Sequence, residues 1–280
     1  MSTPRIGLAL GGGAARGVAH IPMVEAFDEL GLKPARIAGT SFGALVGAAY
    51  ASGLTGREIR EHTVAVLGNR IETARRLFAS KDLNVWELFD VKSFNNVMIE
   101  GSMLADLVLP KKTVGNVDQT EIPLSIIATD LTTQEEVVIT SGDLRAAVAA
   151  SMAIPGLIQA PKHEGRMLVD GAMSNPVPFE RVTEDTDFIV AIDVTGGRLT
   201  EEEHEAASNL QRAFRSIYVM QHHITRLRRE KVDPEIYIYP PVDQFRAGEF
   251  FKARDIMAAA RPAKDELKRA LEAAVTALGG

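Results

Sequence analysis

The chain alternates short apolar runs with longer segments in which apolar residues recur at helical spacing. Ile6–Leu10 is an apolar run that ends at three glycines, a pattern typical of a strand buried on both faces. The same reasoning predicts five further strands, at Arg36–Ala38, Leu124–Ala128, Met167–Val169, Phe188–Ile192 and Glu235–Tyr239.

Helical periodicity occupies the segments between these runs. Val18–Leu30 carries an apolar residue at every third position from Ile21, and Phe42–Ala51 is a run of small apolar residues. Arg212–Lys231 and the segment that follows Pro262 are amphipathic at helical spacing. Strand, glycine turn and helix therefore follow one another twice near the N-terminus, which predicts an α/β fold with a largely parallel central sheet.

We expect one domain over residues 1–280. Its core would span about 5–195, and a C-terminal helical part would span about 205–280. Helices within about 55–120, a segment that includes Trp86, Phe89 and Phe94, would cover one end of the sheet.

Composition excludes several classes of function. With 31 basic and 37 acidic residues the net charge is −6, which argues against a nucleic-acid partner. The absence of cysteine excludes disulfides, thiolate metal sites and cysteine nucleophiles. The six histidines show no metal-binding spacing, so neither a metal nor a cofactor is expected. Without a targeting or membrane-spanning segment in the pattern, we expect a cytoplasmic protein.

The first segment with chemical content is Gly39-Thr40-Ser41-Phe42-Gly43, a G-x-S-x-G sequence. It lies between a predicted strand and a helix of small residues, which is the setting of a nucleophile elbow. The glycines would permit a sharp turn that presents the Ser41 hydroxyl at a helix N-terminus. A glycine turn with a helix-capping serine is the other interpretation of this segment.

A second segment, Gly11-Gly12-Gly13-Ala14-Ala15-Arg16-Gly17, follows the first strand and can direct backbone amides toward an anion. A dinucleotide loop requires glycine where Arg16 stands, and a P-loop requires Lys and Ser or Thr after Gly17. Two interpretations remain, an oxyanion hole made by Gly11, Gly12 and Gly13 and a tight turn without a ligand. Arg16 would support this loop or bind an acidic headgroup.

The third segment is Asp170-Gly171-Ala172, at the end of a predicted strand, where ligands of open α/β sheets gather. Two prolines downstream, Pro176 and Pro178, would stiffen the loop that aims the carboxylate. Alone, Asp-Gly is more often a plain turn. Asp130 and Asp193 also follow predicted strands and are the alternative acids.

Taken together, these three segments resemble the patatin-like phospholipases, in their bacterial branch. The resemblance extends over roughly residues 5–195, including Ala128–Thr133 and Ala150–Gly156, with one extra residue before Arg16. It implies a three-layer α/β/α fold and a serine acyl hydrolase that acts on lipids or other esters through an acyl-enzyme. Ser41 would be the nucleophile, Asp170 the base, and the Gly11–Gly13 loop with Arg16 the oxyanion and substrate-binding site. No metal is implied.

Several alternatives stay open. A triad would need His163, His204, His222 or His223, none of which has a supporting local pattern. An acyltransferase would use the same acyl-enzyme but exclude water, and a nucleotide-binding oxidoreductase would use the glycine-rich loop. The expected partner is a lipid or small ester, and the oligomeric state is unknown from sequence. The cationic Arg212–Lys231 segment also suggests peripheral contact with anionic lipid.

Overall fold

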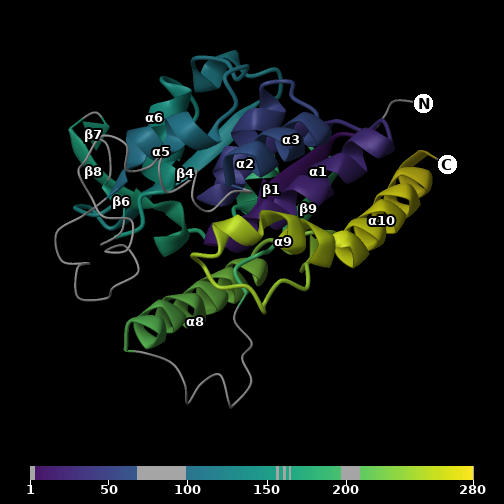
Figure 1. The fold of residues 1–280 in the computed structure, drawn as a ribbon. Helices are drawn as coiled ribbons and strands as arrows, with labels where there is room; N and C mark the ends of the chain where they lie inside the picture. The colour runs from purple at the N-terminus through teal and green to yellow at the C-terminus, as the bar shows by residue number, and fades with distance from the viewer. Residues whose placement is uncertain are drawn as a thin grey trace.

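Eight strands of the described chain form one mixed sheet in the order β10-β9-β1-β2-β4-β8-β7, with β5 paired to β4 (Figure 1). The computed structural model describes residues 4–67, 99–155, 158–159, 162–163, 165–196 and 209–279. The strands are β1 (Ile6–Leu10), β2 (Pro34–Thr40), β4 (Leu124–Asp130), β5 (Glu135–Ile139), β7 (Lys162–His163), β8 (Arg166–Asp170), β9 (Phe188–Ile192) and β10 (Ile236–Ile238). A separate two-stranded sheet pairs β3 (Ile99–Glu100) with β6 (Ile158–Gln159).

The parallel strands of the sheet are adjacent to one another and extend from the edge strand β10 to β4. β10, β9, β1, β2 and β4 run parallel to one another, whereas β5, β8 and β7 are added in antiparallel pairs. All six predicted strands are present, which confirms the largely parallel α/β sheet. β5 was not predicted from the sequence, because its first residue, Glu135, is exposed and its next three are only half-buried.

Helices cover one face of the sheet densely. These helices are α1 (His20–Glu29), α2 (Phe42–Ala51), α3 (Gly56–Leu67), α5 (Gly101–Val108), α6 (Leu144–Ser151), α9 (Ala253–Ala259) and α10 (Arg261–Gly279), whereas α8 (Asn209–Arg229) lies on the other side. α2 packs on β2, α6 on β4, and α1 against both α3 and α10. Their apolar side chains form the main core with the inward residues of β1, β9 and β10.

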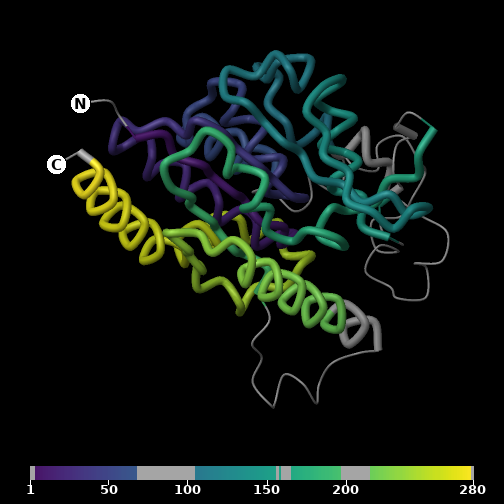
Figure 2. The backbone as a smooth tube through the Cα atoms, turned by 180° about the vertical axis from the view of Figure 1, so that it is seen from behind, coloured from purple at the N-terminus to yellow at the C-terminus, as the bar shows by residue number. Residues whose placement is uncertain are grey.

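The opposite face carries a thinner third layer. A smaller core there joins Ala9, Ala38 and Ala191 to the short helix η5 (Phe179–Val182). α8 lies along this side of the body, as Figure 1 and Figure 2 show, and its Arg229 stacks over the Tyr237 ring. The arrangement is therefore the α/β/α sandwich that the family resemblance implied.

Other predicted boundaries shift by local geometry. The helix expected at Val18–Leu30 is preceded by a 3₁₀ helix, η1 (Ala14–Ala19), and α1 begins at His20. Three more 3₁₀ helices are described. η3 (Val117–Gln119) precedes β4, η4 (Gly171–Met173) directly follows β8, and η6 (Phe250–Lys252) directly precedes α9. Trp86, Phe89 and Phe94 lie outside the described residues.

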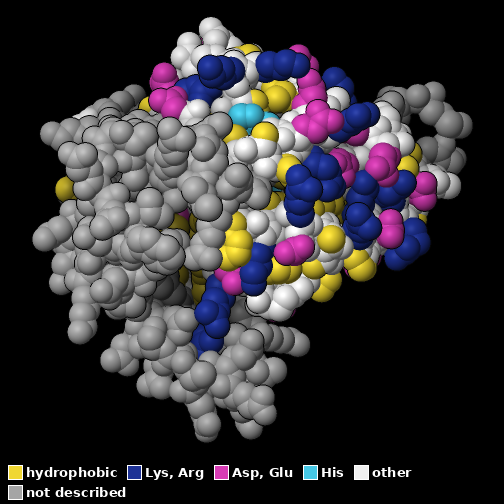
Figure 3. All heavy atoms as spheres, in the orientation of Figure 1, with side chains coloured by type: hydrophobic (Ala, Val, Ile, Leu, Met, Phe, Trp, Pro, Cys, Tyr) yellow, Lys and Arg dark blue, Asp and Glu magenta, His cyan; other side chains and the backbone are white. Residues whose placement is uncertain are grey.

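The surface carries charges of both signs. On the face drawn in Figure 3, Lys and Arg side chains are interspersed with Asp and Glu, consistent with a net charge of only −6 over 280 residues. Among the described helices, none is both long and apolar enough to cross a bilayer.

Candidate active site

Ser41 occupies a strained turn between β2 and α2. Its backbone has φ +54° and ψ −122°, a conformation that costs a non-glycine residue about 1–3 kcal/mol. Both flanking glycines are sterically required: a Cβ at Gly39 would lie 2.7 Å from the Ala44 nitrogen, and one at Gly43 would overlap the Leu10 carbonyl. The turn therefore has the geometry of a nucleophile elbow.

The edge of β4 brings Ser41 and Asp170 together. β4 pairs with β5 along one edge. Along its other edge it pairs first with parallel β2, which ends with Thr40 opposite Ile127. It then pairs with antiparallel β8, in which Asp170 lies opposite Ala128. Since β2 and β8 run toward each other, their carboxyl ends meet at neighbouring positions of one strand. The Ser41 Oγ donates a hydrogen bond to the Asp170 Oδ2 at 2.7 Å.

The Asp170 carboxylate is held out of water. Its side chain is buried, and burial raises its pKa from 3.8 to about 6. Two hydrogen bonds act in the opposite direction: the Ala172 amide donates to Oδ1 at 2.9 Å, and the Ser41 hydroxyl donates to Oδ2. The result is a carboxylate that is ionised at neutral pH yet much more basic than an exposed aspartate.

The glycine-rich loop lies against the elbow. A Cβ at Gly12 would lie 3.4 Å from the Cβ of Ser41. The Gly11 amide, however, donates to the Ile192 carbonyl at 3.0 Å, and the Gly12 amide to the Pro176 carbonyl at 2.9 Å. Two of the three predicted oxyanion donors are thus already engaged, while the amides of Gly13 and Ala14 have no partner among the described residues.

The Arg16 guanidinium is buried and bound by the protein itself. It donates to the backbone carbonyls of Val194, Thr195 and Phe245 and lies 4.5 Å from the centroid of the Tyr218 ring on α8. Of the two roles considered from the sequence, these contacts favour support of the loop over binding of an acidic headgroup.

Two buried residues near the site were given no role from the sequence, although Ser151 lies in the Ala150–Gly156 segment that resembles the family. The Ser151 hydroxyl, at the end of α6, accepts from the Ser41 amide at 2.8 Å and donates to the Ile127 carbonyl at 2.5 Å. His20 Nε2 lies 2.7 Å from the Gly11 carbonyl oxygen, and burial lowers the pKa of His20 to about 4. The neutral ring therefore donates to Gly11 and fixes the start of the glycine-rich loop.

The alternative acids and histidines lie elsewhere. The Asp130 carboxylate accepts from the Thr132 and Thr133 amides, and that of Asp193 accepts from Thr195 and Tyr237. In the described part of the chain no histidine forms a hydrogen bond with Ser41 or Asp170. The side chain of His163 and all of His204 lie outside the described residues.

A family profile described as patatin-like phospholipase matches residues 8–183, a range that contains the glycine-rich loop, Ser41 and Asp170. The chain belongs to the patatin-like phospholipase family. The resemblance seen in the sequence is thereby confirmed.

Curated relatives of this patatin-like protein support the assignment. An uncharacterized NTE family protein of Mycobacterium tuberculosis is 33% identical over 203 residues, which cover 70% of this chain and 50% of that protein. The neuropathy target esterase sws of Drosophila melanogaster is 30% identical over 195 residues, 68% of this chain and 13% of that protein. The chain thus matches about half the length of the mycobacterial relative.

Among solved structures, VipD from Legionella pneumophila is similar with a TM-score of 0.46 and 15% identity, covering 95% of this chain and 67% of VipD. The type III effector ExoU is similar with a TM-score of 0.42 and 14% identity, covering 96% of this chain and 54% of ExoU.

Within the described residues, no cluster of three or more His, Asp or Glu side chains is arranged to hold a metal ion.

Proposed function

We propose that this patatin-like protein is a serine acyl-ester hydrolase that cleaves lipid esters through a dyad of Ser41 and Asp170. The observation that carries the proposal is the 2.7 Å hydrogen bond from the Ser41 Oγ to a buried carboxylate, made in a strained elbow. A serine in this setting is a nucleophile whose base is already in contact with it.

The geometry supports a two-step reaction. Asp170 accepts the Ser41 proton as Oγ attacks the ester carbonyl, and the protonated carboxyl then returns that proton to the leaving alkoxide. Water attacks the acyl-enzyme by the same route, which regenerates Ser41. We assign the oxyanion donors to the amides of Gly13 and Ala14, because those of Gly11 and Gly12 are engaged by backbone carbonyls.

A fluorophosphonate probe tests the nucleophile directly. We expect one covalent adduct, mapped by peptide mass spectrometry to Ser41, together with release of fatty acid from a phospholipid or lysophospholipid. A Ser52→Ala variant is the matched control, since the Ser52 hydroxyl bonds only backbone groups away from the site, the Ala48 carbonyl and the Val114 amide, and its loss should leave labelling intact. An adduct on another residue, or none on folded protein, would contradict the assignment.

The acidity of Asp170 predicts the pH profile. The base must be ionised to accept the serine proton, and its pKa is raised to about 6 by burial. The kcat/KM for a p-nitrophenyl ester should therefore rise through an inflection near pH 6 and stay level toward pH 8. An inflection near pH 4, the region of an exposed aspartate, would show that burial does not set the basicity.

The structure changes which side chains of α8 we expect to contact a lipid surface. Arg228 is bound by Glu136 and Glu180, and Arg229 by Asp233, so these cations are not available to anionic lipid. Three apolar side chains of the same helix are instead exposed by more than half: Val219, Met220 and Leu227. We propose that these side chains, rather than Arg228 and Arg229, touch the lipid surface.

Co-sedimentation with phospholipid vesicles tests this surface. The triple variant Val219→Ser, Met220→Ser, Leu227→Ser should lose most of its vesicle binding, and high salt should weaken the wild-type binding only slightly. Met167→Ser is the control, because Met167 is equally exposed but lies on β8. Binding that disappears in high salt while the triple variant still binds would restore the electrostatic interpretation.

A further inference from the structure

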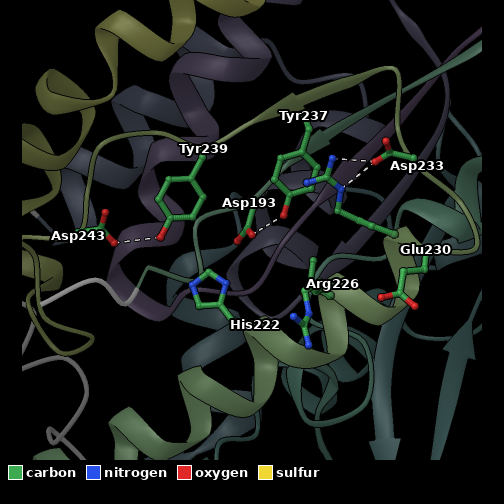
Figure 4. A pocket seen from close by; sticks show the side chains of 10 residues that line it. Asp193, His222, Arg226, Glu230, Asp233, Tyr237, Tyr239 and Asp243 are labelled. Carbon is green, nitrogen blue, oxygen red and sulfur yellow. Dashed lines mark hydrogen bonds and ion pairs between the residues drawn. The ribbon is translucent and has the colours of Figure 1, made fainter.

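An open pocket of about 720 Å³ lies between α8 and the end of β10 (Figure 4). Its volume is within the range of small-molecule sites in proteins. α8 contributes His222, Thr225 and Arg226 to its lining, and Asp193 and Tyr237 contribute from the sheet side. None of these residues belongs to the site built around Ser41.

The pocket and Ser41 share the carboxyl edge of the sheet. Leu10 of β1 pairs with Ile192 of β9 on one side and with Gly39 of β2 on the other. Asp193 and Ser41 therefore follow strands two places apart, at nearly the same level. Because neighbouring strands are about 4.8 Å apart, the two positions are about 10 Å apart along the edge. This separation is comparable with the reach of a glycerophospholipid headgroup from its ester.

One wall of the pocket carries hydrogen-bond donors that have few protein acceptors among the described residues. His222, Thr225 and Arg226 are three and four residues apart on α8 and so share a face. The Thr225 hydroxyl is buried, with 4% of the residue exposed, and has no hydrogen-bond partner in the described chain. Arg226 contacts only the His223 ring, at 3.3 Å, among the described residues. A phosphate oxygen would satisfy these donors.

The remaining lining carries several carboxylates, two of which accept hydrogen bonds from tyrosines. Tyr237 donates to Asp193 at 2.5 Å, and Tyr239 donates to Asp243 at 3.0 Å. Both tyrosines have a raised pKa, caused first by burial and then by the charge of the neighbouring carboxylate. Glu230 also lines the pocket, and its carboxylate has no bonded partner among the described residues.

These carboxylates outnumber the cations of the pocket. Three acids, Asp193, Glu230 and Asp233, face two guanidinium groups, and one of those, Arg229, is already paired with Asp233. A ligand that carried only negative charge would be repelled here. A ligand with a phosphate at one end and an ammonium group at the other would match both walls.

We propose that this pocket binds the zwitterionic headgroup of a glycerophospholipid, a phosphodiester that ends in an ammonium group. Thr225, Arg226 and His222 bind the phosphate, and Glu230, with Asp193 behind it, faces the ammonium. This inference rests on the proposed function, because the headgroup enters the pocket while the ester is at Ser41.

Short-chain lipids that remain monomeric in water test the headgroup site without a membrane. Wild-type protein should prefer dihexanoyl phosphatidylcholine over dihexanoyl phosphatidylglycerol, which lacks the ammonium, and over dihexanoylglycerol, which lacks both charges. In Thr225→Val and Arg226→Gln, the ratio of kcat/KM for the phosphatidylcholine to that for the diacylglycerol should fall about tenfold. Glu230→Gln should shift the preference from phosphatidylcholine toward phosphatidylglycerol.

Lys231→Gln is the matched control, because Lys231 follows α8, is exposed and does not line the pocket. Its substrate ratios should equal those of the wild type. Equal losses on all three lipids in the pocket variants, or unchanged ratios, would overturn the headgroup site.

A binding measurement separates this proposal from that of the catalytic dyad. Calorimetric titration of glycerophosphocholine into Ser41→Ala protein should show binding that Arg226→Gln weakens about tenfold, whether or not the wild type hydrolyses esters. Failure of the hydrolase proposal would leave that binding in place. Absence of binding, with hydrolysis intact, would sink the headgroup site alone.

Discussion

Replacing Ser41 with alanine is expected to reduce ester hydrolysis by roughly four to six orders of magnitude. The alanine removes the atom that forms the acyl bond, so only direct attack by water, assisted weakly by the oxyanion amides, remains. Hydrolysis of p-nitrophenyl butyrate and of a short-chain phospholipid should be measured on the same preparation.

The fold should survive this substitution. Ser41 has a backbone conformation that strains any residue with a side chain, and alanine differs from serine there only by the hydroxyl. Circular dichroism and the melting temperature should therefore match the wild type closely. A folded Ser41→Ala protein that keeps most of its activity would show that another residue is the nucleophile.

Asp170→Asn is expected to cost about three orders of magnitude or more in kcat, with little change in KM for a neutral ester. Asparagine keeps the shape of the side chain, and its carbonyl still accepts from the Ala172 amide that now bonds to Oδ1. Its amide cannot accept the proton of Ser41. The remaining activity should lose the inflection near pH 6, because the titrating group is gone.

The same substitution should not destabilise the protein at pH 7. Burial raises the pKa of Asp170 from 3.8 to about 6, so between these values the folded state binds more protons than the unfolded state. Ionisation above pH 6 therefore costs the folded state roughly 3 kcal/mol. Neutral asparagine avoids this cost, and its melting temperature at pH 7 should equal or exceed that of the wild type.

Histidine variants separate a dyad from a triad. Alanine at His163, His204 or His223 should leave hydrolysis of p-nitrophenyl butyrate within about twofold of wild type, since catalysis needs no imidazole in the proposed reaction. One such variant as inactive as Ser41→Ala, while folded, would establish a histidine base.

The residue pattern predicted the central elements because their causes are local. A short apolar run closed by glycines is typical of a buried strand such as β1, and small residues after Gly39 and Gly43 allow the elbow and α2. These requirements are steric and involve residues close in the sequence, so they are visible in it. Asp170 was not distinguished by its local pattern, since Asp-Gly alone is more often a plain turn, and it became the candidate base only through the combination of three segments that resembles the family.

Long-range pairing could not be predicted in this way. Nothing in the pattern indicates that β8 runs antiparallel into the edge of β4 where β2 ends, yet this register places Asp170 beside Ser41. The engaged amides of Gly11 and Gly12 depend on carbonyls more than 160 positions away in the chain. The partners of Arg16 are similarly distant, so the sequence left its role open.

The helix α8 shows most clearly the difference between what the local sequence predicts and what long-range contacts decide. Helical periodicity predicted α8 and its row of arginines, and on sequence alone those arginines suggested contact with anionic lipid. The tertiary structure pairs Arg228 with Glu136 and Glu180 and places Thr225 and Arg226 in a pocket beside Tyr237. The sequence by itself thus predicted the main strands and helices and the elbow, because each follows from the shape and polarity of neighbouring residues, and its resemblance to the family named Ser41 and Asp170 as the candidate reacting groups. Only the tertiary structure decided which charges are neutralised and which donors stay free, because that depends on contacts between segments distant in the chain.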